Sequence, residues 1–172
     1  MPKPIARTGD EILCAARDVA DFDHIIQALE QLHLPGRLLG RGVDEAVIER
    51  LAGRWVIEAG VVDFNGIMDR FRMVIGYGGL GLASQALAAG LPQLILATDT
   101  EKLLNGHAIE QIGIGRVLRA RATDRETIIR AAAQLYVDPR IRDRALEVAR
   151  QHEAILTVDP IDIITAKVMS LS

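Results

Sequence analysis

The chain has 172 residues, of which 49% are hydrophobic and 25% charged, with a net charge of −3. This length suits one domain with a substantial core and is short for two, and the small negative charge gives no general attraction to nucleic acid or to anionic membranes. Aromatic residues make up only 3%, so the core is built mainly from aliphatic side chains, as in a parallel sheet covered by helices on both faces.

Cysteine and histidine usage argues against disulfides and metal sites. The single cysteine, Cys14, lies in an apolar run and is expected to be a buried, inert thiol. His24, His33 and His152 share no metal-ligand spacing and are expected to be structural, so no metal is expected. The first residues do not resemble a secretory signal, and glutamines and a proline interrupt the apolar stretch Leu80–Ala97. We therefore expect a cytoplasmic protein without a membrane span.

Short apolar runs alternate with amphipathic segments, which predicts repeated β-α units and hence an α/β fold with a parallel sheet of about six strands. The expected strands are Glu11–Ala16, Arg37–Leu39, Trp55–Ile57, Met73–Gly76, Gln93–Ala97 and Arg116–Leu118. The expected helices between them are Asp21–Leu32, Asp44–Ala52, Asp63–Phe71, Leu80–Ala89 and Thr100–Ile112, the last with Asp99 at its cap. Trp55 is interpreted as a core residue of a central strand.

Helical periodicity dominates the end of the chain, from residue 120 to 172. Thr123 and Glu126 have the spacing of a capping box, and Asp138-Pro139 and Asp159-Pro160 mark the starts of two further helices. We therefore expect one Rossmann-like domain over residues 1–172, with about ten flexible residues at its start and a helical tail.

The strongest motif is the glycine-rich turn Gly76–Gly81, read as G-Y-G-G-L-G, which follows a predicted strand and begins a predicted helix. Such a turn aims unpaired backbone N–H groups and the helix dipole at an anion, for which a phosphate is the natural ligand. About three β-α units precede it, so we expect it at the centre of the sheet, where the strand order reverses. Glycines needed only for close helix–sheet packing are the structural alternative.

The spacing of Gly76, Gly78 and Gly81 also fits the dinucleotide fingerprint, with Asp99 in the place of the ribose-binding acid. A nicotinamide-dinucleotide protein is therefore a further hypothesis. The fingerprint belongs on the first β-α turn of its unit, however, and the order of elements here disfavours it.

A longer pattern surrounds this turn. Met73–Leu118 contains Gly78, Gly79, Gly81, then Ala89-Gly90-Leu91-Pro92, Asn105 and Gly113-Ile114-Gly115. In this spacing the stretch resembles the C-terminal domain of GT-B glycosyltransferases of the UDP-glycosyltransferase type, whose pattern is His-Gly-Gly-x-Gly-Thr, Ala-Gly-x-Pro, an Asp/Glu-Gln pair, Asn-Ala and Gly-x-Gly.

The resemblance implies a donor site for a nucleotide diphosphate sugar, most simply a UDP-sugar, which is a substrate, and no separate cofactor is expected. The implied diphosphate contacts are Tyr77, Gly78, Gly79, Leu80, Gly81 and Ser84; the implied ribose and base contacts are Gln85 and Phe64; the implied sugar contacts are Glu101, Lys102 and Asn105.

The departures from the family pattern concern polar donor contacts. The family's phosphate-contacting His is Tyr77 here, its Thr is Leu82, the ribose-binding carboxylate is Gln85, and the Gln of the sugar-reading pair is Lys102. The family also places the acceptor pocket and catalytic base in an N-terminal domain, so no catalytic residue is assigned in this chain. The implied partner is that domain or a separate acceptor-binding subunit, and the alternative function is a catalytically inactive scaffold.

Two further features have alternative interpretations. His107 follows the sugar-reading region and is either a phosphate contact or a solvated surface residue. Four arginines near the end of the predicted sheet are either a steering patch for an anionic donor or a solvated basic surface; they are Arg116, Arg119, Arg121 and Arg125.

Overall fold

The computed structural model describes residues 9–18, 23–41, 43, 45–58, 64, 67–153 and 169. In chain order the elements are β1 Glu11–Asp18, α1 Asp23–Leu32, β2 Gly36–Arg41, α2 Glu45–Leu51, β3 Trp55–Glu58, the 3-10 helix Met68–Arg70, β4 Phe71–Gly76, α3 Leu80–Ala88, β5 Gln93–Ala97, α4 Thr100–Gln111, β6 Gly115–Arg119, α5 Arg125–Val137 and α6 Pro139–Gln151. The strands form one parallel sheet in the order β3-β2-β1-β4-β5-β6, which confirms the predicted α/β class.

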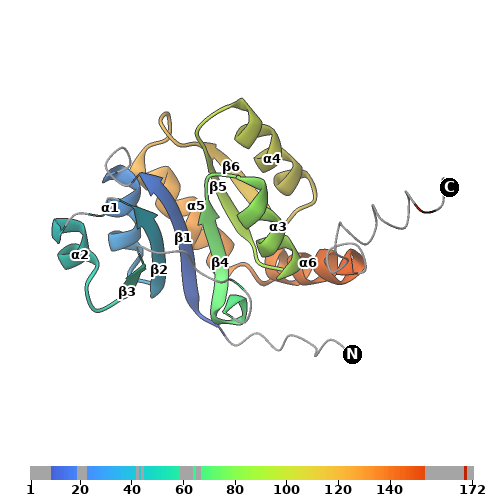
Figure 1. Ribbon diagram of the computed structural model, residues 1–172, viewed down its shortest axis with the longest axis horizontal. Coiled ribbons are helices and arrows are strands. Elements are labelled where there is room, and N and C mark those ends of the chain that lie inside the picture. The colour runs from blue at the N-terminus through green and yellow to red at the C-terminus, as the bar shows by residue number, and fades with distance from the viewer. Residues whose placement is uncertain are drawn as a thin grey trace.

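The strand order reverses between β1 and β4, which pair through Ile12↔Met73 and Leu13↔Val74. The chain proceeds from β1 toward one edge of the sheet and from β4 toward the other. Because crossovers between parallel strands are right-handed, the crossover helices α1 and α2 lie on one face of the sheet, and the crossover helices α3 and α4 lie on the other (Figure 1). The loop after β4 therefore opens at the switch point, as the sequence predicts.

The core divides into layers on the two faces of the sheet. Ile12, Cys14 and Ile75 face α1, α2 and α5 in the larger cluster, while their neighbours Leu13 and Val74 face α3 because successive side chains of a strand alternate. A third cluster joins α4 to α6 through Ile109, Ile114, Ala145 and Val148. Cys14 is 2% exposed, as expected for an inert thiol.

Two expectations about local structure are wrong. The predicted helix Asp63–Phe71 contains only the 3-10 helix Met68–Arg70 among its described residues, and Phe71 already lies in β4 because its side chain is buried on the sheet. Asp124 caps α5 by accepting a hydrogen bond from Thr127 N at 2.8 Å. The Thr123 hydroxyl instead donates to Arg119 O, so Thr123 and Glu126 form no capping box.

Trp55 is buried, as predicted for a core residue, but β3 is an edge strand and not a central one. Its ring lies where a Cβ on Gly36 would be, 2.5 Å from Trp55 Cζ3, so the neighbouring strand carries glycine at this position. At the other end of the chain, α6 begins at Pro139 with Asp138 as its cap, as predicted. The helix expected at Asp159-Pro160 and the flexible residues expected at the start lie, apart from Gly9, Asp10 and Met169, outside the described residues.

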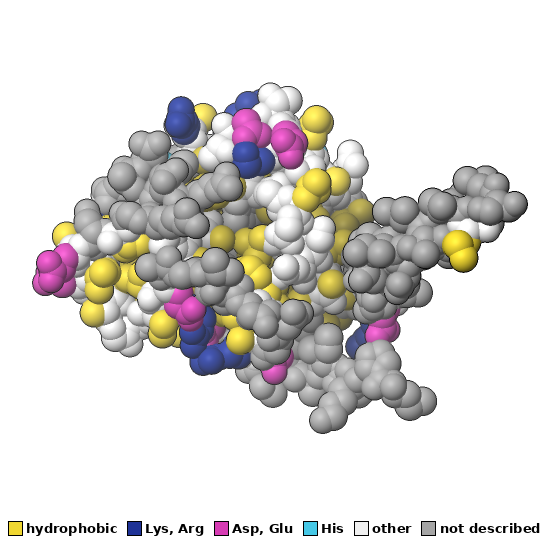
Figure 2. All heavy atoms as spheres, viewed as in Figure 1, with side chains coloured by type: hydrophobic (Ala, Val, Ile, Leu, Met, Phe, Trp, Pro, Cys, Tyr) yellow, Lys and Arg dark blue, Asp and Glu magenta, His cyan; other side chains and the backbone are white. Residues whose placement is uncertain are grey.

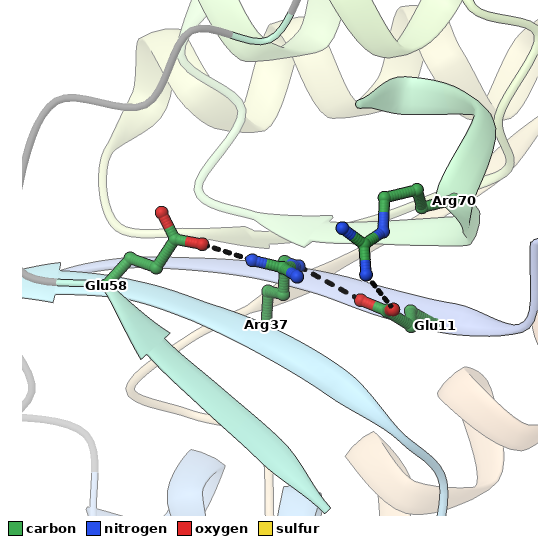
Figure 3. A network of polar contacts seen from close by, with 4 residues as sticks. All are labelled: Glu11, Arg37, Glu58 and Arg70. Carbon is green, nitrogen blue, oxygen red and sulfur yellow. Dashed lines mark hydrogen bonds and ion pairs between the residues drawn. The ribbon is translucent and has the colours of Figure 1, made fainter. Parts of the chain in front are cut away.

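Four charged side chains link the first three strands to the segment before β4 (Figure 3). The Arg37 guanidinium lies between two carboxylates: its Nε donates to Glu11 Oε2 at 3.1 Å, and an Nη atom donates to Glu58. Arg70 also donates to Glu11, at 3.1 Å. The Arg37 side chain is only 16% exposed, so this network ties the amino ends of β1 and β2 to the carboxyl end of β3 where solvent screens the charges weakly.

Candidate functional site

The glycine-rich turn connects β4 to α3 at the switch point of the sheet. The N-cap residue Gly79 has φ −65° and ψ 136°, and no side chain caps the helix. The N–H groups of the first helical turn have no acceptor within the helix, and the helix dipole adds partial positive charge at this end. The turn therefore presents several backbone N–H groups that can donate hydrogen bonds to an anion.

Its glycines divide into two kinds. At Gly78, φ is +83°, and a Cβ would lie 2.8 Å from Ile95 Cγ2 and 2.9 Å from Lys102 O, so both conformation and packing require glycine. At Gly79 and Gly81 a Cβ would meet nothing within 4 Å. The second pair leaves open space directly in front of the helix N-terminus, which close helix–sheet packing does not explain.

The side chains predicted to surround the diphosphate point in different directions. Tyr77 packs against the larger hydrophobic cluster, on the α1 and α5 face. Leu80 is 63% exposed at the first position of α3, and Ser84 is exposed further along that helix. Leu82 packs against the cluster under α3, with its Cδ2 3.1 Å from where a Cβ on Gly76 would lie. Backbone groups are therefore the main polar feature of the turn.

The predicted base and ribose contacts lie on the α3 face of the sheet. Phe64 is partly buried and packs against the same hydrophobic cluster as Leu82, and Gln85 is exposed on α3. The sequence of α3 contains no charged residue, and the surface over this helix carries uncharged side chains, with Lys, Arg, Asp and Glu gathered elsewhere on this face (Figure 2). Both roles stay predictions.

The predicted sugar contacts occupy the first half of α4. Asp99 caps this helix by accepting from Lys102 N at 3.0 Å, and its carboxylate also pairs with the Lys102 ammonium. The hydrogen bond from the Lys102 side chain, followed by the one from its backbone, lowers the pKa of Asp99. The positive charge of Lys102 is thus compensated within α4. Glu101 is exposed, and Asn105 donates from Nδ2 to Gly78 O at 2.9 Å.

A shallow pocket of about 240 Å³ lies beside this helix, at the carboxyl ends of β5 and β6. Its lining residues are Ala97, Thr98, Asp99, Thr100, Leu103, Arg119, Arg121 and Ala122. The four arginines of the sequence analysis are therefore divided: Arg119 and Arg121 line the pocket, Arg116 is exposed on β6, and Arg125 donates to Gln27 at 3.1 Å.

The histidines lie apart from one another. His24 Nε2 is 2.9 Å from Ala120 O, and His33 Nδ1 is 2.7 Å from an Nη atom of Arg54. His152 contacts Val148 O, and exposed His107 lies 3.5 Å from a Glu110 carboxylate oxygen. Within the described part of the chain no group of three or more His, Cys, Asp and Glu side chains could hold a metal, and no helix there is long and apolar enough to cross a membrane.

Sequence reasoning missed the contacts between the turn and α4. The Asp99–Lys102 pair could be predicted from the sequence, because an acidic N-cap and a lysine three residues later are adjacent on a helix. The approach of Lys102 and Asn105 to Gly78 depends on how α4 packs on the sheet, which no local pattern reveals.

Comparison with known proteins agrees with this architecture. The family model described as "Erythromycin biosynthesis protein CIII-like, C-terminal domain" matches residues 54–168. The erythronolide mycarosyltransferase of Saccharopolyspora erythraea is 25% identical over 134 residues, covering 69% of this chain and 32% of that protein.

Among solved structures, the spinosyn forosaminyltransferase SpnP is similar with a TM-score of 0.77 and 18% identity, over 99% of this chain and 46% of that one. LpCGTa in complex with UDP has a TM-score of 0.75 and 15% identity, over 89% and 39%. UDP-glucose: anthocyanidin 3-O-glucosyltransferase in complex with UDP has a TM-score of 0.74 and 13% identity, over 90% and 38%.

This chain thus spans about a third of the curated relative and less than half of these solved structures. The family match covers most of the chain, and the fold likeness extends over nearly all of it. The chain belongs to the family of erythromycin biosynthesis protein CIII-like C-terminal domains, and its fold is that of the C-terminal half of a GT-B glycosyltransferase.

Proposed function

We propose that this chain is a single donor-binding domain that holds a nucleotide diphosphate sugar, most simply a UDP-sugar, for a glycosyltransferase. The observation that carries the proposal is the open N-terminus of α3 at the switch point, where Gly79 and Gly81 leave space in front of uncapped amides. Clefts at this position of open α/β sheets are the usual place for ligands, and helix N-termini bind phosphates well.

The family and the fold support a diphosphate over other anions. LpCGTa and the anthocyanidin glucosyltransferase, which share this fold, were solved in complex with UDP. In this chain the turn's amides would bind the diphosphate, with the sugar toward Glu101 on α4 and the base toward Phe64. Because Asp99 already pairs with Lys102, we expect the backbone amides to supply most of the attraction and the affinity to be modest.

Transfer of the hexosyl group needs a pocket for the acceptor and a catalytic base. We assign no residue of this chain to either role. We propose that an N-terminal domain or a separate subunit supplies both, and that closure against it excludes water and aligns donor with acceptor. The chain by itself is then expected to bind donor and to transfer sugar poorly or not at all.

Titration of the isotope-labelled chain with UDP, followed through backbone amide resonances, tests this proposal. We expect the largest shifts at Gly79, Leu80 and Gly81, because their amides meet the diphosphate. UMP, which lacks the second phosphate, serves as the matched ligand and should shift the same amides less. Saturating shifts that avoid the turn altogether would contradict the proposed site.

A second candidate is a catalytically inactive glycosyltransferase-like scaffold. Three observations favour it: the Tyr77 side chain packs into the core, Leu82 packs under α3, and Lys102 pairs with Asp99, so none of the three offers the diphosphate a free polar side chain. The two candidates differ in nucleotide binding. A chain that binds an acceptor subunit but no UDP at millimolar concentration is a scaffold.

A further inference from the structure

Gly106 lets helix α4 pack closely against β5 and β6. A Cβ at this position would lie 2.4 Å from Val117 Cγ2 and 3.1 Å from Ile95 Cγ2, so any other residue would push the helix off the sheet. Gly106 is buried in the middle of α4. The first half of this helix is thereby brought against the turn between β4 and α3.

Two contacts follow from this approach. The carbonyl oxygen of Lys102 lies 2.9 Å from where a Cβ on Gly78 would be, so the backbone of α4 touches the turn directly. Three residues later, on the same side of the helix, Asn105 Nδ2 donates to Gly78 O at 2.9 Å. This bond joins residues 27 apart in the chain and is partly buried. It acts on the residue whose left-handed conformation, φ +83°, sets the direction of the turn.

We propose that Asn105 is a positioning residue that holds Gly78, and through it the amides of Gly79 and Gly81, in the geometry that receives the diphosphate. The sequence resemblance implies instead that Asn105 contacts the sugar. The inference rests on the proposed function for the identity of the ligand, while the Asn105 contact itself does not depend on that function.

The same contacts couple the two ends of the donor site. Glu101 and Lys102 lie on the helix that carries Asn105, so the side that faces the sugar and the turn that faces the diphosphate are joined by one hydrogen bond and one backbone contact. Loss of the amide donor leaves the Gly78 carbonyl without this partner and loosens the turn relative to α4. Binding of every ligand that uses the turn is then affected alike.

Calorimetric titration of Asn105→Ala with UDP and with UDP-glucose separates the two roles. A positioning role lowers the affinity for both ligands by the same factor, about tenfold for one partly buried hydrogen bond. A sugar contact lowers the affinity for UDP-glucose alone, and that result, or unchanged affinity for both, overturns the proposal. Gln111→Ala, an exposed position at the end of the same helix, is the matched control. Asn105→Leu keeps a similar side-chain volume without the donor and without an added charge, and it replaces Asn105→Ala if that variant does not fold.

A readout without ligand keeps the two proposals distinguishable. If the unaltered chain binds neither UDP nor UDP-glucose, the proposed function fails, and the amide resonances of Gly78 and Gly79 in the ligand-free variant decide the inference. We expect these resonances to move or broaden in Asn105→Ala while those of β6 stay in place. Resonances of the turn that coincide with those of the unaltered chain overturn it.

Discussion

Gly78 and Gly81 lie three residues apart in the same turn, and the same substitution should have opposite effects at the two positions. In Gly78→Ala the new methyl group must adopt φ +83° and approach Ile95 Cγ2 to 2.8 Å and Lys102 O to 2.9 Å. The left-handed conformation costs about 1–2 kcal/mol and the close contacts about 1–3 kcal/mol more. We expect a loss of about 2–5 kcal/mol in the free energy of unfolding.

In Gly81→Ala the methyl group meets nothing within 4 Å and lies in the first turn of α3. Alanine is favoured over glycine inside a helix by about 1 kcal/mol, so this variant should gain stability. For a domain of this size 1 kcal/mol corresponds to about 2–4 °C in Tm. Scanning calorimetry should therefore find Gly78→Ala about 10 °C below the unaltered chain and Gly81→Ala slightly above it. Equal Tm values for the two variants would refute the account of the turn.

Three further predictions concern the rest of the fold. Arg37→Met leaves the Glu58 carboxylate without its cation and Glu11 with Arg70 alone, so it should cost about 1–3 kcal/mol in urea unfolding. Arg50→Met, at an exposed pair, should cost less than about 1 kcal/mol, and equal losses would contradict this. Burial raises the pKa of Cys14 from 9.0 to about 12, so the folded thiol should resist thiol reagents at pH 8, and rapid labelling of the folded chain would contradict this. Above pH 9 only the unfolded thiol ionises, so the free energy of unfolding should fall by up to about 1.4 kcal/mol per pH unit more than in Cys14→Ala. Asp99→Asn keeps the cap acceptor but removes the carboxylate that pairs with the Lys102 ammonium. UDP should then bind about two- to fivefold more tightly in calorimetry, and this gain should shrink at high salt. Weaker binding would show that the Asp99–Lys102 pair itself shapes the site.

Much of the fold follows from patterns local in the sequence. The strand Gln93–Ala97 has the predicted bounds, because a proline precedes a short, uninterrupted apolar run. The helix predicted over Asp63–Phe71 is wrong because periodicity over nine residues does not distinguish a helix from the segment that leads into a strand. Burial of Phe71 on the sheet places this residue in β4. The edge position of Trp55 was also beyond local reasoning, since the lateral order of strands depends on the direction of each crossover.

The candidate site shows the same division. Glycine spacing predicts the turn, because a left-handed residue and an open helix N-terminus need residues without side chains. The three β-α units that precede the turn predict its place at the switch point. The directions of the surrounding side chains depend on tertiary packing: Tyr77 faces the core, and Asn105 reaches back to Gly78 because Gly106 lets α4 approach the sheet. A family pattern assigns these positions to the site without determining what each side chain contacts.

Calorimetric titration of the chain with UDP, beside Gly79→Val, tests the central claim most directly. Valine suits φ −65° and ψ 136° and should cost at most about 1 kcal/mol in stability, but it fills the space in front of the helix. We predict a dissociation constant in the micromolar to millimolar range, about 10⁻⁶ to 10⁻³ M, for the unaltered chain and at least about tenfold weaker binding for the variant. Absence of heat with UDP, TDP and GDP at millimolar concentration, from a folded sample, or equal binding by Gly79→Val would contradict the account.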